Sequence, residues 1–254
     1  AMTGMLPVAE IMFMDFITLA MDQIVNQAAK ARSMFGGQAS LPLVIRTPHG
    51  GGLNAGPQHS QCLEAWFAHV PGLKVVCPAN AADAYGLIRS AIDDPDPVIV
   101  VENKTLYAAK SELPDDPQAV PIGKATISRP GRDVTVVTYG AMVREALTAA
   151  DQLTIEGVDI EVLDLRSIQP WDEAMVVSSL ARTHRLVVAH EAVEAFGVGA
   201  EVVARMADIG FDELDAPIIR VGAPFAPSPL AQSLEAAYRP DASDIVRAVR
   251  RTLV

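Results

Sequence analysis

The chain has 254 residues, of which 50% are hydrophobic and 20% are charged. This amount of apolar material excludes a disordered chain, and the length suits two compact α/β domains better than one. Thirty-one acidic against twenty basic residues give a formal net charge of -11, with no run of Lys or Arg. Because such a chain repels a phosphate backbone, the composition excludes nucleic acid as a partner.

The most apolar stretch is 7–25, but acidic residues interrupt it. Carboxylates are costly at bilayer depth, so we expect no membrane span, and no basic segment marks a secretory signal. Cys62 and Cys77 are too few for a disulfide framework and too isolated in the sequence for a zinc motif. We therefore expect a cytoplasmic protein.

Short apolar runs alternate with segments of helical period along the whole chain. A strand-like segment, 7–13, comes first. The runs predicted to be buried parallel strands are 41–45, 73–76, 97–101, 134–138, 160–165, 186–188 and 218–221. The segments predicted to be helices are 17–28, 61–68, 81–94, 143–156, 171–183, 199–209 and 241–253. This alternation predicts an α/β fold of the doubly wound kind.

The periodicity fails between residues 106 and 133, where four prolines and two glycines occur. Such a segment is typical of a linker between domains. The sequence therefore predicts two domains, at 1–125 and 126–254.

The densest polar segment is RTPHGGG at 46–52, followed by QHSQ at 58–61. It follows a predicted strand directly, and loops at the carboxyl ends of parallel strands line the ligand crevice of open α/β sheets. His59 precedes a predicted helix, so we expect it near a helix N-terminus. The alternatives are a plain flexible loop and a histidine with a structural hydrogen bond.

Other motifs are absent or ambiguous. The glycines match neither a Walker loop nor G-x-G-x-x-G, and the five histidines show no metal-binding spacing. No nucleophile elbow of the G-x-S-x-G type occurs. The acidic turn at 93–96 is either a solvated turn or a hard-cation site. The GVG segment at 197–199 is interpreted as a helix start.

Six motifs lie in order along the chain: EIMFMDF at 10–16, DQI at 22–24, QHSQ at 58–61, PGLKVV at 71–76, DLR at 164–166 and FGVGAE at 196–201. Together they resemble the beta subunit of the thiamine-dependent 2-oxoacid dehydrogenase component. Such subunits belong to the pyruvate, branched-chain and acetoin complexes. The resemblance covers essentially the whole chain.

The resemblance implies a thiamine pyrimidine-binding domain at 1–125, lacking its N-terminal part, and a transketolase C-terminal-like domain at 126–254. It also implies an alpha subunit as partner in an α2β2 heterotetramer, with thiamine diphosphate at the boundary between the subunits. The chain has no Gly-Asp-Gly motif followed by paired asparagines. We therefore expect the alpha subunit to hold the diphosphate and its magnesium ion.

By position in the motifs, Met12 and Phe16 are expected to line the aminopyrimidine pocket, and His59 is expected to act in catalysis. The loop 49–61 is expected to reach toward the reaction centre. The resemblance also implies a structural potassium ion, bound by the backbone oxygens of Leu43 and Ala91 and by those around Asp94 and Asp96. The expected contacts with the dihydrolipoamide acyltransferase core are Asp215 and Val254.

The chain departs from the family in one respect. The glutamate that hydrogen-bonds the aminopyrimidine nitrogen is expected just upstream of Ala1 and is absent from this sequence. Loss of such a group would remove several kcal/mol of barrier lowering.

The leading functional hypothesis is oxidative decarboxylation of a 2-oxo acid, with pyruvate as the first expected substrate, and acyl transfer to a lipoyl lysine. Acetoin and branched-chain 2-oxo acids are the alternative substrates. An inactive structural subunit is the alternative role, and a nicotinamide-dependent Rossmann enzyme ranks lowest.

Overall fold

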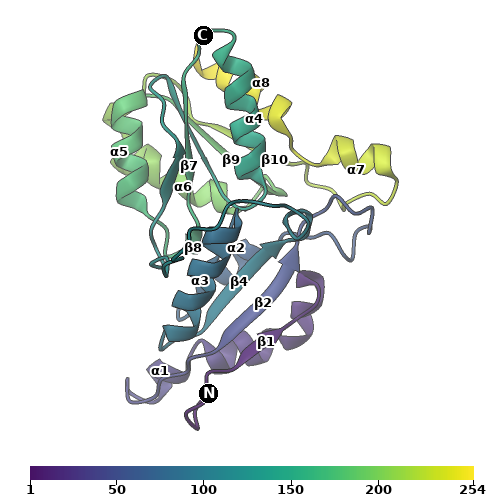
Figure 1. The fold of residues 1–254 in the computed structure, drawn as a ribbon, viewed down its shortest axis with the longest axis vertical. Helices are drawn as coiled ribbons and strands as arrows, with labels where there is room; N and C mark the ends of the chain where they lie inside the picture. Colours follow the sequence, from purple (N-terminus) through teal and green to yellow (C-terminus); the bar gives the residue numbers. More distant parts are fainter.

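The chain builds two five-stranded sheets, which form the cores of two stacked domains (Figure 1). The computed structural model describes residues 1–254. Both sheets are mostly parallel and carry helices on their faces, which confirms the predicted α/β class. No helix combines the length and the apolar character that crossing a bilayer requires.

The first sheet has the strand order β1-β2-β4-β3-β8. Its strands are β1 (Val8–Glu10), β2 (Val44–His49), β3 (Lys74–Val76), β4 (Val98–Asn103) and β8 (Ser167–Gln169). The helical segments of this domain are η1 (Met14–Ala20), η2 (Gln23–Ala28), α1 (Ala31–Met34), α2 (Glu64–Ala68), α3 (Ala81–Asp93) and η3 (Lys104–Leu106). Every residue of β4 is buried, as expected for a strand covered on both faces.

The second sheet has the strand order β10-β9-β6-β7-β5. Its strands are β5 (Thr126–Arg129), β6 (Val134–Thr138), β7 (Ile160–Asp164), β9 (Leu186–Val193) and β10 (Ile219–Ala223). Its helices are α4 (Met142–Thr154), α5 (Glu173–Thr183), α6 (Val198–Ile209), η4 (Phe211–Glu213), α7 (Gln232–Tyr238) and α8 (Ala242–Thr252). Asp241 begins α8 with a capping box, in which its side chain accepts from the backbone of Ser243 and Asp244.

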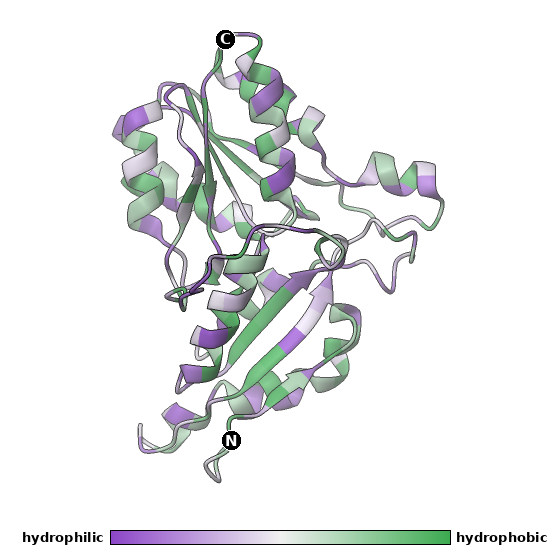
Figure 2. Cartoon of the chain, in the orientation of Figure 1, coloured by the Kyte–Doolittle hydropathy of each residue, from purple (hydrophilic) through white to green (hydrophobic).

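Apolar residues gather on the strands inside each domain (Figure 2). One cluster of 25 buried apolar side chains extends across the domain boundary, from Phe67 and Val75 in the first domain to Leu163 and Val188 in the second. The two domains therefore share a continuous core, and burial of apolar area holds them together.

The seven predicted strands are all present, and 134–138 coincides with β6. The prediction at the N-terminus is wrong: the single helix expected over 17–28 is replaced by the 3-10 helix η1 and the π-helix η2. Met14 and Ile17 are both fully buried and lie three residues apart, a spacing that a 3-10 helix stacks on one face.

Purely parallel sheets were expected, but each sheet contains one antiparallel strand. β5 lies inside the segment predicted to be a linker and pairs antiparallel with β7. β8 follows the second domain's first strands in the sequence, yet it pairs antiparallel with β3 of the first sheet, with Val75 opposite Gln169. The chain therefore returns to the first domain after it has begun the second.

Candidate active site at the domain boundary

The loop after β2 crosses from the first domain to the second. The backbone N–H of Gly51 donates a 2.7 Å hydrogen bond to Oε1 of Glu191, on β9. Gly50 has φ +88°, and a Cβ there would lie 2.6 Å from Nδ2 of Asn103 and 2.9 Å from Oε1 of Glu191. Glycine is required at this position because both the backbone conformation and the close approach exclude a side chain.

Glu191 is the centre of this contact. Its Oε2 accepts a 2.7 Å hydrogen bond from Nδ2 of Asn103, and its Oε1 accepts a 3.1 Å hydrogen bond from Nε of Arg239. The carboxylate is buried and has charge-assisted partners from both domains. The glycine part of the loop is therefore closed within the chain's own fold.

His49 is also buried, with 2% of its side chain exposed. Its Nδ1 lies 3.2 Å from Oε2 of Glu64, and Oε1 of Glu64 accepts a 2.8 Å hydrogen bond from the hydroxyl of Tyr139. Burial alone would lower the pKa of His49, but the carboxylate of Glu64 outweighs it and the pKa is raised. Burial likewise opposes ionisation of Glu64, yet His49 brings the pKa of Glu64 below its ordinary value. Each group of this buried pair therefore favours the charged form of the other.

His59 lies at the opposite end of the same loop and is only partly buried. Its ring contacts Phe13 and Phe16 edge-on, with centroid separations of 4.9 and 5.2 Å. The neighbouring side chains point out of the domain: 74% of Met12 and 43% of Phe16 are exposed. The structure thus brings His59 and Phe16 together on an open aromatic edge, with Met12 exposed in the same N-terminal segment.

Two charged residues hold the turn that carries His59. Nζ of Lys104 donates a hydrogen bond to the carbonyl oxygen of His59, and it lies 5.1 Å from the centroid of the Phe13 ring. Asp15 accepts hydrogen bonds from the backbone N–H and the side-chain amide of Gln61, at 3.2 and 2.9 Å. His59 itself lies five residues before α2, which begins at Glu64 and not at residue 61 as predicted. The position of His59 is therefore fixed by the hydrogen bonds of Lys104 and Asp15 and not by a helix N-terminus.

The residues expected to bind a cation lie just before β2, at the end of α3 and in the turn that follows α3. Both carboxylate oxygens of Asp94 accept 2.6 Å hydrogen bonds from Nζ of Lys74, and Asp96 pairs with Nε of Arg32 at 2.5 Å. The carbonyl oxygen of Leu43 accepts from the backbone N–H of Val98 at 2.9 Å. Ala91 is buried within α3. The two side-chain charges are thus already neutralised.

Arg185 lies beside Asp215, one of the two residues expected to contact an acyltransferase core, and beside the C-terminal segment that carries the other, Val254. Its Nη1 lies 3.9 Å from Oδ2 of Asp215, and its Nε donates a 2.9 Å hydrogen bond to the carbonyl oxygen of Thr252. Val254 ends the chain two residues later and is exposed. Asp215 and the C-terminal segment therefore lie on one face of the second domain.

A cavity of about 360 Å³ lies between the loop and the second domain. Its lining includes Ser60, Cys62, Glu191, Phe225, Ser228 and Tyr238. The hydroxyl oxygens of Ser60 and Ser228 are buried without a hydrogen-bond partner.

Four residues of this site were not predicted from the sequence: Glu64, Tyr139, Glu191 and Lys104. The one signal that could have identified any of them is the position of Glu64 within the apolar run 63–68, because a charge there requires a buried partner.

Family models match both domains. The transketolase pyrimidine-binding domain matches residues 1–110, and the transketolase C-terminal domain matches residues 123–245. A solved structure described as a split-gene transketolase, an inactive beta4 tetramer, superposes with a TM-score of 0.81 at 26% identity, covering 99% of this chain and 77% of that one. Fold and domain order thus define a two-domain chain of the transketolase type.

Curated relatives specify the family further. The beta subunit of the acetoin:2,6-dichlorophenolindophenol oxidoreductase of Bacillus subtilis is 48% identical over 246 residues, which is 97% of this chain and 72% of that subunit. Beta subunit 2 of the mitochondrial pyruvate dehydrogenase E1 component of Oryza sativa is 46% identical over 255 residues, covering 99% of this chain and 68% of the relative. The chain belongs to the family of 2-oxoacid and acetoin dehydrogenase beta subunits, as the motifs indicated.

Proposed function

We propose that this chain, paired with an alpha subunit in an α2β2 heterotetramer, oxidatively decarboxylates a 2-oxo acid and transfers the acyl group to a lipoyl lysine of an acyltransferase core. The observation that carries this proposal is the open aromatic edge of Phe13, Phe16 and His59. This edge is one half of a binding site and lies on the surface, beside the loop whose glycines Gly50 and Gly51 pack against Glu191. A second chain is needed to cover it.

The exposed side chains fit thiamine diphosphate. Met12 and Phe16 offer an apolar wall with an aromatic ring, which suits a flat aminopyrimidine. When bound, this cofactor supplies the electron sink for the carbanion left by decarboxylation. The chain has no Gly-Asp-Gly motif, so we expect the alpha subunit to bind the diphosphate and its magnesium ion.

His59 has the chemistry and the position for proton transfer at this edge. Its imidazole is partly exposed between two aromatic rings, and its backbone is tethered by Lys104. An imidazole can donate a proton to a reacting group through a ring nitrogen and take it back. His49 cannot share this role, because it is buried against Glu64.

Two peripheral sites complete the proposal. Because the carboxylates of Asp94 and Asp96 are occupied by Lys74 and Arg32, a structural potassium ion would take backbone oxygens near Leu43 and Ala91. The face that carries Asp215 and Val254 is proposed to dock the acyltransferase core, through an exposed carboxylate and an exposed terminus.

Pyruvate and acetoin are both candidate substrates, because relatives named for each are almost equally similar, at 48% and 46% identity. The chain should be reconstituted with its alpha subunit and assayed for dye reduction with pyruvate, acetoin and branched-chain 2-oxo acids. We expect turnover with one of these classes and its loss in His59→Asn, with His69→Asn as the matched control. Absence of turnover with every substrate would instead support a purely structural subunit.

A further inference from the structure

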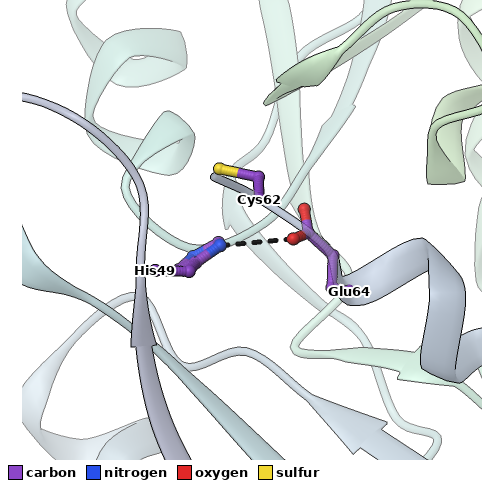
Figure 3. A group of neighbouring side chains, drawn as sticks. All are labelled: His49, Cys62 and Glu64. Carbon is purple, nitrogen blue, oxygen red and sulfur yellow. Dashed lines mark hydrogen bonds and ion pairs between the residues drawn. The ribbon is translucent and has the colours of Figure 1, made fainter. Parts of the chain in front are cut away.

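Three metal-ligating side chains converge at a place that the proposed function does not use. A ring nitrogen of His49, Sγ of Cys62 and a carboxylate oxygen of Glu64 all lie within 4.8 Å of one another (Figure 3). His49 ends β2, Glu64 begins α2, and Cys62 lies two residues before that helix. We propose that these three residues form a Zn²⁺ site, with water as the fourth ligand.

The donor set suits zinc. Imidazole, thiolate and carboxylate are its ordinary protein ligands, and a site with three protein ligands and one water is four-coordinate. Bond lengths of about 2.0 to 2.3 Å place tetrahedral ligand atoms roughly 3.5 Å apart. Nδ1 of His49 and Oε2 of Glu64 are already 3.2 Å apart. Only Cys62 has to move, by on the order of 1 Å.

Neighbouring groups orient the ligands. The hydroxyl of Tyr139 donates to Oε1 of Glu64 at 2.8 Å, which leaves Oε2 for the metal. Sγ of Cys77 lies 3.9 Å from Nε2 of His49, the ring nitrogen that faces away from Glu64. Hydrogen bonds of this kind, from outside the ligand set, fix the ligands of natural zinc sites.

Charge balance also favours the ion. A thiolate at Cys62 and a carboxylate at Glu64 would supply two negative charges to Zn²⁺, and His49 would bind as a neutral imidazole. The site would then hold a dication, two anions and a neutral ligand, so its net charge would be zero. Charge neutrality decides the cost of any ion in a buried place.

The cavity beside the loop provides access. Cys62 is the one member of the cluster that lines it, so the ion can approach from that side and water can occupy the fourth position. The unpartnered hydroxyls of Ser60 and Ser228 line the same cavity and are available to that water. The other charged groups that act on His49 are Glu191 and Lys104, of opposite sign.

Calorimetric titration of the chelator-treated full chain with Zn²⁺ alone tests the site. We expect one ion per chain and, from runs in two buffers of different ionisation enthalpy, release of protons from the ligands. Co²⁺ should give a thiolate charge-transfer band. Cys62→Ser and Glu64→Gln should each weaken Zn²⁺ binding at least about 100-fold. His69→Asn, which removes an exposed histidine outside the cluster, should bind as the wild type does.

The proposal is overturned if the chain takes up no stoichiometric Zn²⁺, or if Cys62→Ser binds with unchanged affinity. Circular dichroism of each variant confirms that the fold persists. None of these readouts depends on the alpha subunit or on turnover, so the result is independent of the proposed function.

Discussion

The hydroxyl of Tyr139, just after β6 in the second domain, donates a 2.8 Å hydrogen bond to Oε1 of Glu64 at the start of α2 in the first. Glu64 is fully buried, and its other oxygen faces His49. Because both oxygens have partners, an otherwise costly charge is accommodated inside the shared core. The polar triad therefore joins the two domains at a fixed register.

Tyr139→Phe should lower the free energy of unfolding by about 1 to 3 kcal/mol, because Glu64 loses a donor that water cannot replace. Urea unfolding at neutral pH measures the loss. Tyr85→Phe is the matched control: the hydroxyl of Tyr85 accepts from Arg89 on the surface, so the change should stay within about 0.5 kcal/mol. Equal effects for the two variants would contradict the role given to Tyr139.

In the metal-free chain, the His49–Glu64 pair should make stability depend on pH. The folded pKa of His49 lies above its ordinary 6.5, so the imidazolium contributes fully below that value and its contribution is lost as pH rises through the raised pKa. His49→Gln should abolish this fall and cost about 3 to 5 kcal/mol at lower pH, since it leaves a buried carboxylate unpaired. Unfolding curves across pH 5 to 9 should show both effects. His184→Gln, at a more exposed pair with Glu213, should retain the wild-type profile.

Lys104 is expected to position His59 without reacting itself. Lys104→Met removes the ammonium that holds the His59 carbonyl, so kcat of the reconstituted enzyme should fall about 10- to 100-fold with little change in KM. Amide exchange at 58–61 should accelerate in parallel. Lys30→Met is the control, because Lys30 donates to the Pro71 carbonyl on the exposed surface. Unchanged exchange together with unchanged kcat would refute the positioning role.

Asp164 should oppose stability at high pH. Burial raises its pKa from 3.8 to about 7, and one of its oxygens has no partner. The folded state thus binds more protons than the unfolded state between these values, so stability falls as pH rises through this window. Asp164→Asn should remove the fall and stabilise the chain at pH 8 by a few kcal/mol, at about 1.4 kcal/mol per pKa unit. Asp115→Asn, in an exposed segment, should leave the unfolding profile unaltered.

Strands with continuous apolar runs were predictable, and short antiparallel ones were not. Val134–Thr138 is buried at every position, so its sequence alone identifies it. β5 carries exposed residues at its centre and lies among prolines, and β8 has only three residues. These strands form because they pair with β7 and β3, and the local sequence pattern does not reveal that pairing.

The candidate site was predictable where it depends on one motif. The motifs identified Met12, Phe16 and His59, and the structure places Phe16 against His59. Glu64 and Tyr139 are 75 residues apart in the chain, and Gly51 and Glu191 are 140 apart. Partners at such separations follow from how two domains pack, so the sequence could not pair them.

Because β8 pairs with β3 of the first sheet, each half of the chain depends on the other to complete its fold. A chain that stops within 106–133 would leave β3 with an unpaired edge, and the other half would carry a strand with nothing to join. Exposed edges of this kind favour aggregation. Neither half is a free-standing module; produced together as two pieces, they should instead assemble by fragment complementation.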